Sequence, residues 1–156
     1  MSPDIQTSIS SLLDQTNVVL VKEQNVQKGE LIKQLVSIAC KGLNEMDTAE
    51  ILDRVLKREE GIPTTLDTGL SIPHSRVDEI TTFRAALAVV PAGIKDPAAG
   101  NAVIKVMFLF LSPSNPEFFQ KHLQILAELS ERFKDSFVSA LTNAGSIEEV
   151  LKIINE

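Results

Sequence analysis

The run Val103-Ile104-Lys105-Val106-Met107-Phe108-Leu109-Phe110-Leu111 is apolar except for Lys105, and turn-forming residues bound it, Gly100-Asn101 before and Ser112-Pro113 after. Its length and its boundaries are those of a strand rather than a helix. A strand without polar alternation is buried on both faces, as central strands of α/β proteins are. A second apolar run with one charge covers residues 83–90. The two runs therefore predict central strands with helices on both sides.

Segments with helical periodicity surround these strands. Apolar residues recur at helical spacing over residues 28–41, and Gly42 then supplies a stop. Asp47 and Glu50 form a capping-box pair, which predicts a second helix that continues to about Arg58. Further helices are expected over residues 116–133, 135–143 and 146–154, and an edge strand over residues 18–21. In the helix 116–133, one stripe is expected to face the core: Phe118, Phe119, Leu123, Ile125, Leu126, Leu129 and Phe133.

Helical periodicity fails between residues 61 and 76, where Pro63, Gly69 and Pro73 stand among polar residues. This composition predicts a loop that contains a short extended piece at residues 70–72, with His74 at its exit. Together the segments predict a single three-layer α/β domain over residues 1–156. Its mixed central sheet is expected to have about five strands, with helices on both faces.

Composition excludes several classes of protein. Hydrophobic residues make up 44% and charged residues 23%, and no apolar run approaches the roughly 18 residues of a membrane span. The net charge is −6, with no Lys/Arg cluster and no Trp or Tyr, so nucleic acid is not an expected partner. The N-terminus lacks a secretory signal and the single Cys40 cannot form an internal disulfide, which favours the cytoplasm.

Three side chains are candidates for chemistry, and each also has an ordinary structural explanation. His74 follows Pro73 near a sheet edge, where an imidazole can act as a nucleophile, although a loop histidine is more often a solvated turn residue. His122 lies on an apolar helical stripe, so it is either a ligand or a core-edge residue with a satisfied hydrogen bond. Arg58 either interacts with the helix dipole or holds phosphate oxygens through its planar donors. Cys40 is expected to be buried packing without a role.

A resemblance to a known family runs through these residues. It begins with Arg58-Glu59, Thr64 to Leu66 and Gly69-Leu70-Ser71-Ile72-Pro73-His74. This sequence resembles the active-site signature of the mannitol/fructose class of enzyme IIA, the phosphocarrier domain of the bacterial phosphoenolpyruvate-dependent phosphotransferase system. The resemblance continues through Asp96-Pro97, the strand 103–111, His122-Leu123 with Leu126, and the C-terminal helix.

The resemblance implies a type-2 enzyme IIA in which His74 accepts a phosphoryl group from the carrier protein HPr and passes it to an enzyme IIB. Arg58 and His122 match the phosphate-contacting arginine and the second histidine of the family. Together with Thr64, they are expected to stabilise charge on the transferring group. This role of His122 requires the two imidazoles to lie within about 10 Å of each other. Neither a cofactor nor a metal is required.

Departures from the family pattern leave the subgroup open. Thr65 and Asp67 stand where glycines are common, and Ser75 replaces another common glycine. The Asp67 carboxylate either orients the imidazole or repels the incoming anion. Three functions therefore remain: a relay in sugar uptake, a nitrogen-related regulator that binds protein targets, and a hydrolase or metal site at His74 and His122, which the lack of clustered ligands disfavours.

Overall fold

A five-stranded mixed sheet forms the middle layer of the computed structural model, which describes residues 8–156. The long strands pair antiparallel at its centre, and the short strands pair parallel with them at the flanks. The strand order is β1 (Val18–Leu20), β4 (Arg84–Asp96), β5 (Ala102–Pro113) and β2 (Leu70–Ser71), and β3 (His74–Val77) also pairs with β5. β1 is the expected edge strand.

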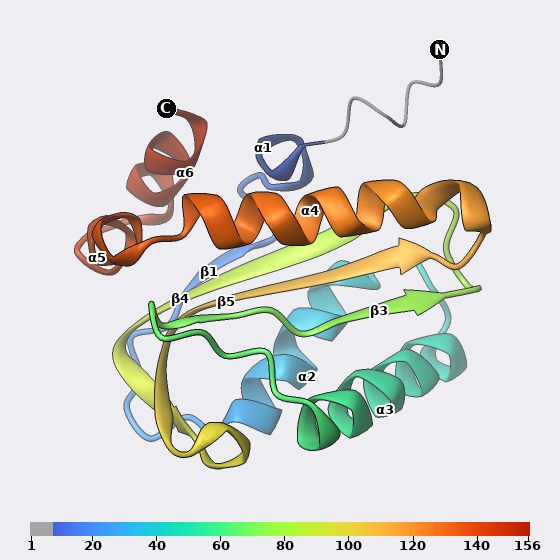
Figure 1. Ribbon diagram of the computed structural model, residues 1–156, viewed down its shortest axis with the longest axis horizontal. Coiled ribbons are helices and arrows are strands. Elements are labelled where there is room, and N and C mark those ends of the chain that lie inside the picture. The colour runs from blue at the N-terminus through green and yellow to red at the C-terminus, as the bar shows by residue number, and fades with distance from the viewer. Residues whose placement is uncertain (1–7) are drawn as a thin grey trace.

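Helices cover both faces of this sheet (Figure 1). The lower layer in that view contains α2 (Lys28–Ala39) and α3 (Glu45–Gly61). The upper layer contains α1 (Ile9–Leu12), α4 (Phe119–Arg132), α5 (Asp135–Thr142) and α6 (Ile147–Asn155). The prediction of a three-layer α/β fold is confirmed. None of the helices within residues 8–156 has the combination of length and hydropathy needed to cross a bilayer.

Alternation along the central strands divides the interior into two cores. On β4, Leu87 and Val89 belong to the core between the sheet and α4. Ala86 and Ala88 belong to the core between the sheet and the helices α2 and α3. Both sets are fully buried, as the apolar runs predict.

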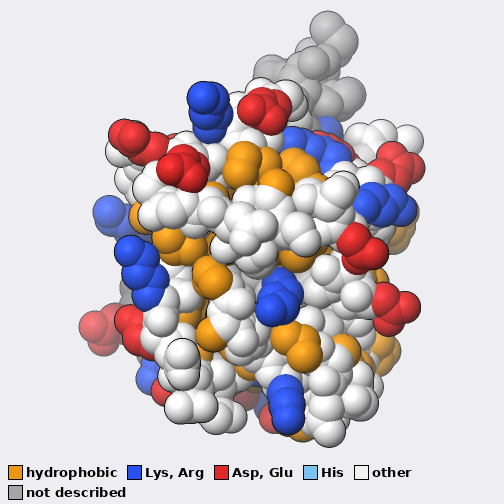
Figure 2. Space-filling view, turned by 90° about the vertical axis from the view of Figure 1, so that its left-hand side faces the viewer, with side chains coloured by type: hydrophobic (Ala, Val, Ile, Leu, Met, Phe, Trp, Pro, Cys, Tyr) orange, Lys and Arg blue, Asp and Glu red, His pale blue; other side chains and the backbone are white. Residues whose placement is uncertain are grey.

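On the end of the molecule that carries α5 and α6, apolar side chains are interspersed with charged ones, and no histidine is visible there (Figure 2).

Two boundaries differ from the sequence prediction for local reasons. The prediction that Asp47 and Glu50 cap the second helix is wrong. The N-cap is Asn44, whose side chain accepts a hydrogen bond from the Asp47 amide, and α3 starts at Glu45. β4 continues to Asp96 through a bulge between Val89 and Ile94. Gly93 within that bulge has φ +79°, and a Cβ there would lie 2.7 Å from the Val103 side chain.

Two further features matter for the site. His74 begins strand β3 instead of ending a loop, because the amide of Phe110 donates to the carbonyl of Pro73 and β3 pairs with the far end of β5. α4 follows a 3-10 turn at Pro116–Phe118, and two members of its predicted core stripe face solvent. Phe119 is 45% exposed and Leu123 is 48% exposed, so this part of the stripe prediction is wrong.

Candidate functional site

A pocket of about 330 Å³ opens where β3, the end of α3 and the beginning of α4 meet. It brings together three of the four predicted site residues, Arg58, His74 and His122. The complete lining consists of Arg58, His74, Ser75, Arg76, Phe119, His122, Leu123 and Leu126. The pocket therefore combines two imidazoles and two guanidinium groups with an apolar rim.

His74 is held in one orientation by the chain just before it. Its Nδ1 lies 2.6 Å from the carbonyl oxygen of Ile72, and its ring stacks on Phe110 with 5.4 Å between centroids. Because a carbonyl oxygen only accepts, Nδ1 carries the proton and Nε2 carries the lone pair. Burial lowers the pKa of His74, the nearby Arg58 charge lowers it further, and the hydrogen bond to Ile72 opposes both. The ring is therefore a neutral imidazole with an available nucleophilic nitrogen.

His122 lies directly beside the His74 ring. The ring centroids of His74 and His122 are 5.4 Å apart, and the planes are tilted by 53°. Nδ1 of His122 lies 2.6 Å from the buried Ser112 hydroxyl. Burial, followed by repulsion from His74 and Arg76, lowers the pKa of His122 to about 4. Both rings are thus uncharged at neutral pH and close enough to contact one phosphoryl group.

The two arginines reach the pocket from different elements. Arg58 lies in the last turn of α3, and no carboxylate of the described residues forms an ion pair with it. Arg76 lies two residues after His74 in β3 and donates to the carbonyl oxygens of Ser114 and Asn115. Its guanidinium carbon lies 4.8 Å from the centre of the Phe119 ring. Sequence reasoning missed Arg76, although the two-residue period of a strand puts it on the same face as His74.

Thr64 is not brought to the pocket lining. Its hydroxyl contacts both carboxylate oxygens of Glu59 at 2.9 Å, and the amide of Ile72 donates to it at 3.2 Å. Glu59 is buried and also accepts from the Thr64 amide. Thr64 therefore connects the end of α3 to the residue whose carbonyl orients His74.

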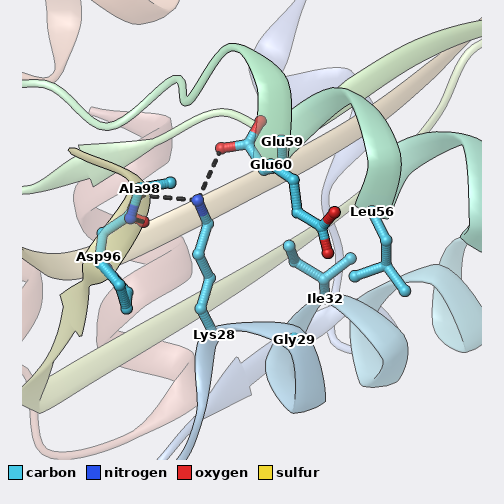
Figure 3. A pocket seen from close by; sticks show the side chains of 9 residues that line it. Lys28, Gly29, Ile32, Leu56, Glu59, Glu60, Asp96 and Ala98 are labelled. Carbon is cyan, nitrogen blue, oxygen red and sulfur yellow. Dashed lines mark hydrogen bonds and ion pairs between the residues drawn. The ribbon is translucent and has the colours of Figure 1, made fainter.

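A charged network supports this connection from behind. The ammonium of Lys28 lies 3.2 Å from Glu59 Oε1 and 2.8 Å from Asp96 Oδ2, beside a second pocket of about 220 Å³ (Figure 3). The Thr65 hydroxyl donates to Asp96 at 2.6 Å. Burial raises the pKa of Asp96, but the hydrogen bonds from Lys28 and Thr65 outweigh burial and lower it overall. The loop before His74 is thus attached to α2, α3 and β4.

The other departures from the family pattern occupy different places. Ser75 lines the pocket, whereas Asp67 is exposed and is not part of the lining. The carbonyl of Ile72, and not Asp67, bonds the His74 ring. Among residues 8–156, the group of three His, Cys, Asp or Glu side chains whose ligand atoms lie close enough to surround one cation is Asp47, Glu50 and Glu79, and it includes neither histidine.

Cys40 is buried as expected, and burial raises its thiol pKa. An electron-rich thiolate is therefore disfavoured at this position, which agrees with a packing role.

Two known proteins are similar to this chain in sequence. The fructose-specific EIIA component of the phosphotransferase system of Haloferax volcanii is 29% identical over 124 residues, which cover 80% of this chain and 79% of the relative. The nitrogen regulatory protein of Klebsiella oxytoca is 26% identical over 131 residues, 83% of this chain and 79% of the relative.

A solved structure shows the same arrangement of elements. The mannitol enzyme IIA of Escherichia coli, solved in a complex with phosphorylated enzyme IIB, superposes with a TM-score of 0.73 at 19% identity and covers 92% of this chain and 96% of that one. The model of the family described as "Phosphoenolpyruvate-dependent sugar phosphotransferase system, EIIA 2" matches residues 11–156. This chain therefore belongs to the EIIA 2 family of that phosphotransferase system.

Proposed function

We propose that the protein is a phosphoryl carrier in which Nε2 of His74 accepts a phosphoryl group from the phosphohistidine of an HPr-like protein and passes it to an enzyme IIB. Residues 1–156 act in this proposal as one enzyme IIA domain. The observation that carries it is the Nδ1 contact of His74 with the Ile72 carbonyl, inside a pocket that also contains Arg58 and His122. This contact leaves Nε2 as the nucleophile.

In the transfer step, the lone pair of His74 Nε2 forms a bond to phosphorus while the donor's nitrogen–phosphorus bond breaks. The electron pair of the broken bond returns to the donor imidazole, which becomes neutral. The His74 ring takes up the positive charge and keeps its Nδ1 proton on the carbonyl of Ile72. No proton has to leave or enter the pocket, so the reaction is readily reversible and the next acceptor removes the group in the same way.

The surrounding groups stabilise the transferring group in this proposal. Arg58 offers planar donors to the phosphoryl oxygens, and His122 offers one further donor. Thr64 contributes indirectly, by keeping Ile72 and hence His74 in place. Arg76 adds positive charge to the same pocket.

The apolar rim fits brief docking of a protein substrate. Phe119 and Leu123 are the exposed apolar side chains of the pocket lining, and they lie on the same helix as His122. Apolar surface beside charged groups is typical of transient protein contacts. Both HPr and enzyme IIB would then dock on the same rim, one after the other.

A regulatory role is the second candidate. The relation to the Klebsiella oxytoca nitrogen regulatory protein favours it, because the same phosphohistidine can switch binding to other proteins. Transfer from the phosphorylated protein to an enzyme IIB and then to a sugar supports the first candidate. Phosphorylation-dependent binding to a protein target without such transfer supports the second.

The acceptor assignment is tested by incubation with phosphoenolpyruvate, enzyme I and HPr, followed by intact mass measurement. We expect one phosphoryl group on the wild-type protein and none on His74→Ala. Phosphorylation of His74→Ala at the wild-type rate and level would show that His74 is not the acceptor. A wild-type protein that stays unmodified with an active HPr would refute the carrier function.

A further inference from the structure

Ser112 is a buried polar residue that the mechanism above does not use. It lies near the end of β5, its exposure is 0%, and its partner on β3 is Arg76. Its hydroxyl oxygen lies 2.6 Å from Nδ1 of His122. This contact occupies Nδ1 of His122 and leaves Nε2, the other ring nitrogen, without this partner.

The direction of this hydrogen bond follows from the hydroxyl's surroundings. Within residues 8–156, the Ser112 oxygen has no other hydrogen-bond partner. If Nδ1–H donated to it, the hydroxyl proton would be buried without an acceptor, which is unfavourable. If the hydroxyl donates to an unprotonated Nδ1, both groups are satisfied. A neutral His122 ring then carries its proton on Nε2.

The two histidines consequently have opposite tautomers. The Ile72 carbonyl can only accept, so His74 is protonated on Nδ1 and has a nucleophilic Nε2. The Ser112 hydroxyl donates, so His122 is protonated on Nε2 and its lone pair is occupied on Nδ1. With 5.4 Å between the ring centroids, one ring is equipped to attack phosphorus and the other to donate to a phosphoryl oxygen.

We propose that Ser112 is a positioning residue that fixes His122 as the Nε2–H tautomer, which makes His122 a hydrogen-bond donor and prevents it from acting as a second phosphoryl acceptor. The inference rests on the proposed carrier function and specifies how its second histidine acts. Burial of His122 keeps the ring neutral, so the tautomer, and not the charge, defines its role.

The tautomers are measured by NMR of the unphosphorylated protein with ¹⁵N-labelled histidines at neutral pH. In the wild type we expect protonated Nε2 for His122 and protonated Nδ1 for His74. In Ser112→Ala we expect His122 to lose its single tautomer and to show the averaged nitrogen shifts of a mixture. Ser112→Thr keeps the hydroxyl and should restore the wild-type shifts. Ser71→Ala is the matched control, since Ser71 is equally buried in the neighbouring strand but its hydroxyl has no partner.

Phosphoryl transfer gives the second readout. Transfer from phospho-HPr to His74 should be at least about tenfold slower in Ser112→Ala and near wild type in Ser112→Thr. A wild-type His122 protonated on Nδ1, or an unchanged tautomer in Ser112→Ala, overturns the inference. If Ser112→Ala does not fold, a wild-type His122 protonated on Nδ1 still overturns the inference, and Ser112→Thr with wild-type shifts supports it. Absence of phosphorylation in the wild type, with His122 still protonated on Nε2, refutes the carrier function and not the tautomer assignment.

Discussion

At the scale of single residues, the two histidines differ in the hydrogen-bond partner of Nδ1. His74 contacts a carbonyl two residues away, and His122 contacts a hydroxyl ten residues away on another element. The first contact is local, so the Pro73-His74 sequence is informative about it. The second depends on how α4 packs against the end of β5, which the helical pattern does not specify. His122 was therefore recognisable as a candidate, but Ser112 was not.

His122→Gln should slow phosphorylation of His74 without preventing it. A hydrogen bond to a charged group is worth about 1.5 to 3 kcal/mol, which corresponds to roughly one to two orders of magnitude in rate. Glutamine is close to histidine in size, so the cavity effect is small. The rate is measured by rapid quenching of the reaction with phospho-HPr. A wild-type rate in this variant would show that His122 does not stabilise the phosphoryl group and is a structural residue at the edge of the core.

The protein should lose stability between pH 6.5 and pH 4 because of its buried histidines. The pKa of His122 falls from 6.5 to about 4 on folding, so the unfolded chain binds more protons in this range. The free energy of unfolding therefore rises with pH across this window and its His122 contribution is complete above it. At pH 4.5 the loss from His122 is on the order of 2–3 kcal/mol. The lowered pKa of His74 acts in the same direction.

Urea unfolding of the wild type and His122→Gln at pH 7 and pH 4.5 isolates this contribution. The wild type should lose more stability on acidification than the variant, since carboxylate effects are common to both. Equal losses in the two proteins would contradict the lowered pKa.

At the scale of elements, the network around Lys28 joins α2, α3 and β4 to the loop that holds His74. Asp96 is fully buried and Glu59 nearly so, and Lys28 lies between them. These residues are 31 and 37 positions apart along the chain, and only the packing of three elements brings them together. No periodicity in the sequence predicts such a contact.

Lys28→Met should destabilise the protein by about 3–5 kcal/mol, because two buried carboxylates lose their cation. It should also slow phosphoryl transfer, since Thr64 and Thr65 are held by the same carboxylates. Lys57→Met is the control, because the Lys57–Asp53 pair is exposed to solvent and should contribute little to stability. Denaturant unfolding measures the stability of the two variants, and rapid quenching of the reaction with phospho-HPr measures their transfer rates. Similar small losses in the two variants would show that the network does not support the loop.

Sequence patterns predicted most elements because apolar periodicity and capping residues are local signals. The two central strands, the edge strand and the helices of both layers were predicted, whereas the short α1 has too few residues to show a period. The orientation of α4 was not predictable in full. A helical stripe specifies neighbouring positions, but the end of the helix extends past the core, and Phe119 and Leu123 are exposed there. Arg76 was missed because the strand that carries it was expected to be a loop.

At the scale of the whole molecule, the pocket lies where the two helical layers meet at the sheet. Arg58 comes from the lower layer in Figure 1, His122 from the upper layer, and His74 from the sheet between them. In the proposed function, partner proteins reach His74 over the rim of this pocket. The exposed rim residues of α4 are therefore expected to affect docking more than folding.

Leu123→Ser should raise KM for phospho-HPr several-fold and leave kcat and the unfolding free energy nearly unchanged. The side chain is 48% exposed, so little core packing is lost, while apolar contact with a partner is reduced. Met46→Ser is the control: Met46 is 73% exposed but lies at the opposite end of α3 from Arg58, about 18 Å along the helix. Equal kinetic effects of the two substitutions would exclude a specific docking role for Leu123.

The separation of the interior into two cores has a further consequence for local opening. The sheet isolates α3 from α4, so either helix can detach while the other stays packed on its own core. An anion held by Arg58 and His122 at once contacts both layers, and it has to be released before either helix detaches. Modification of His74 should therefore slow the amide hydrogen exchange of α3 and α4 together, two helices that share no core in the unmodified protein.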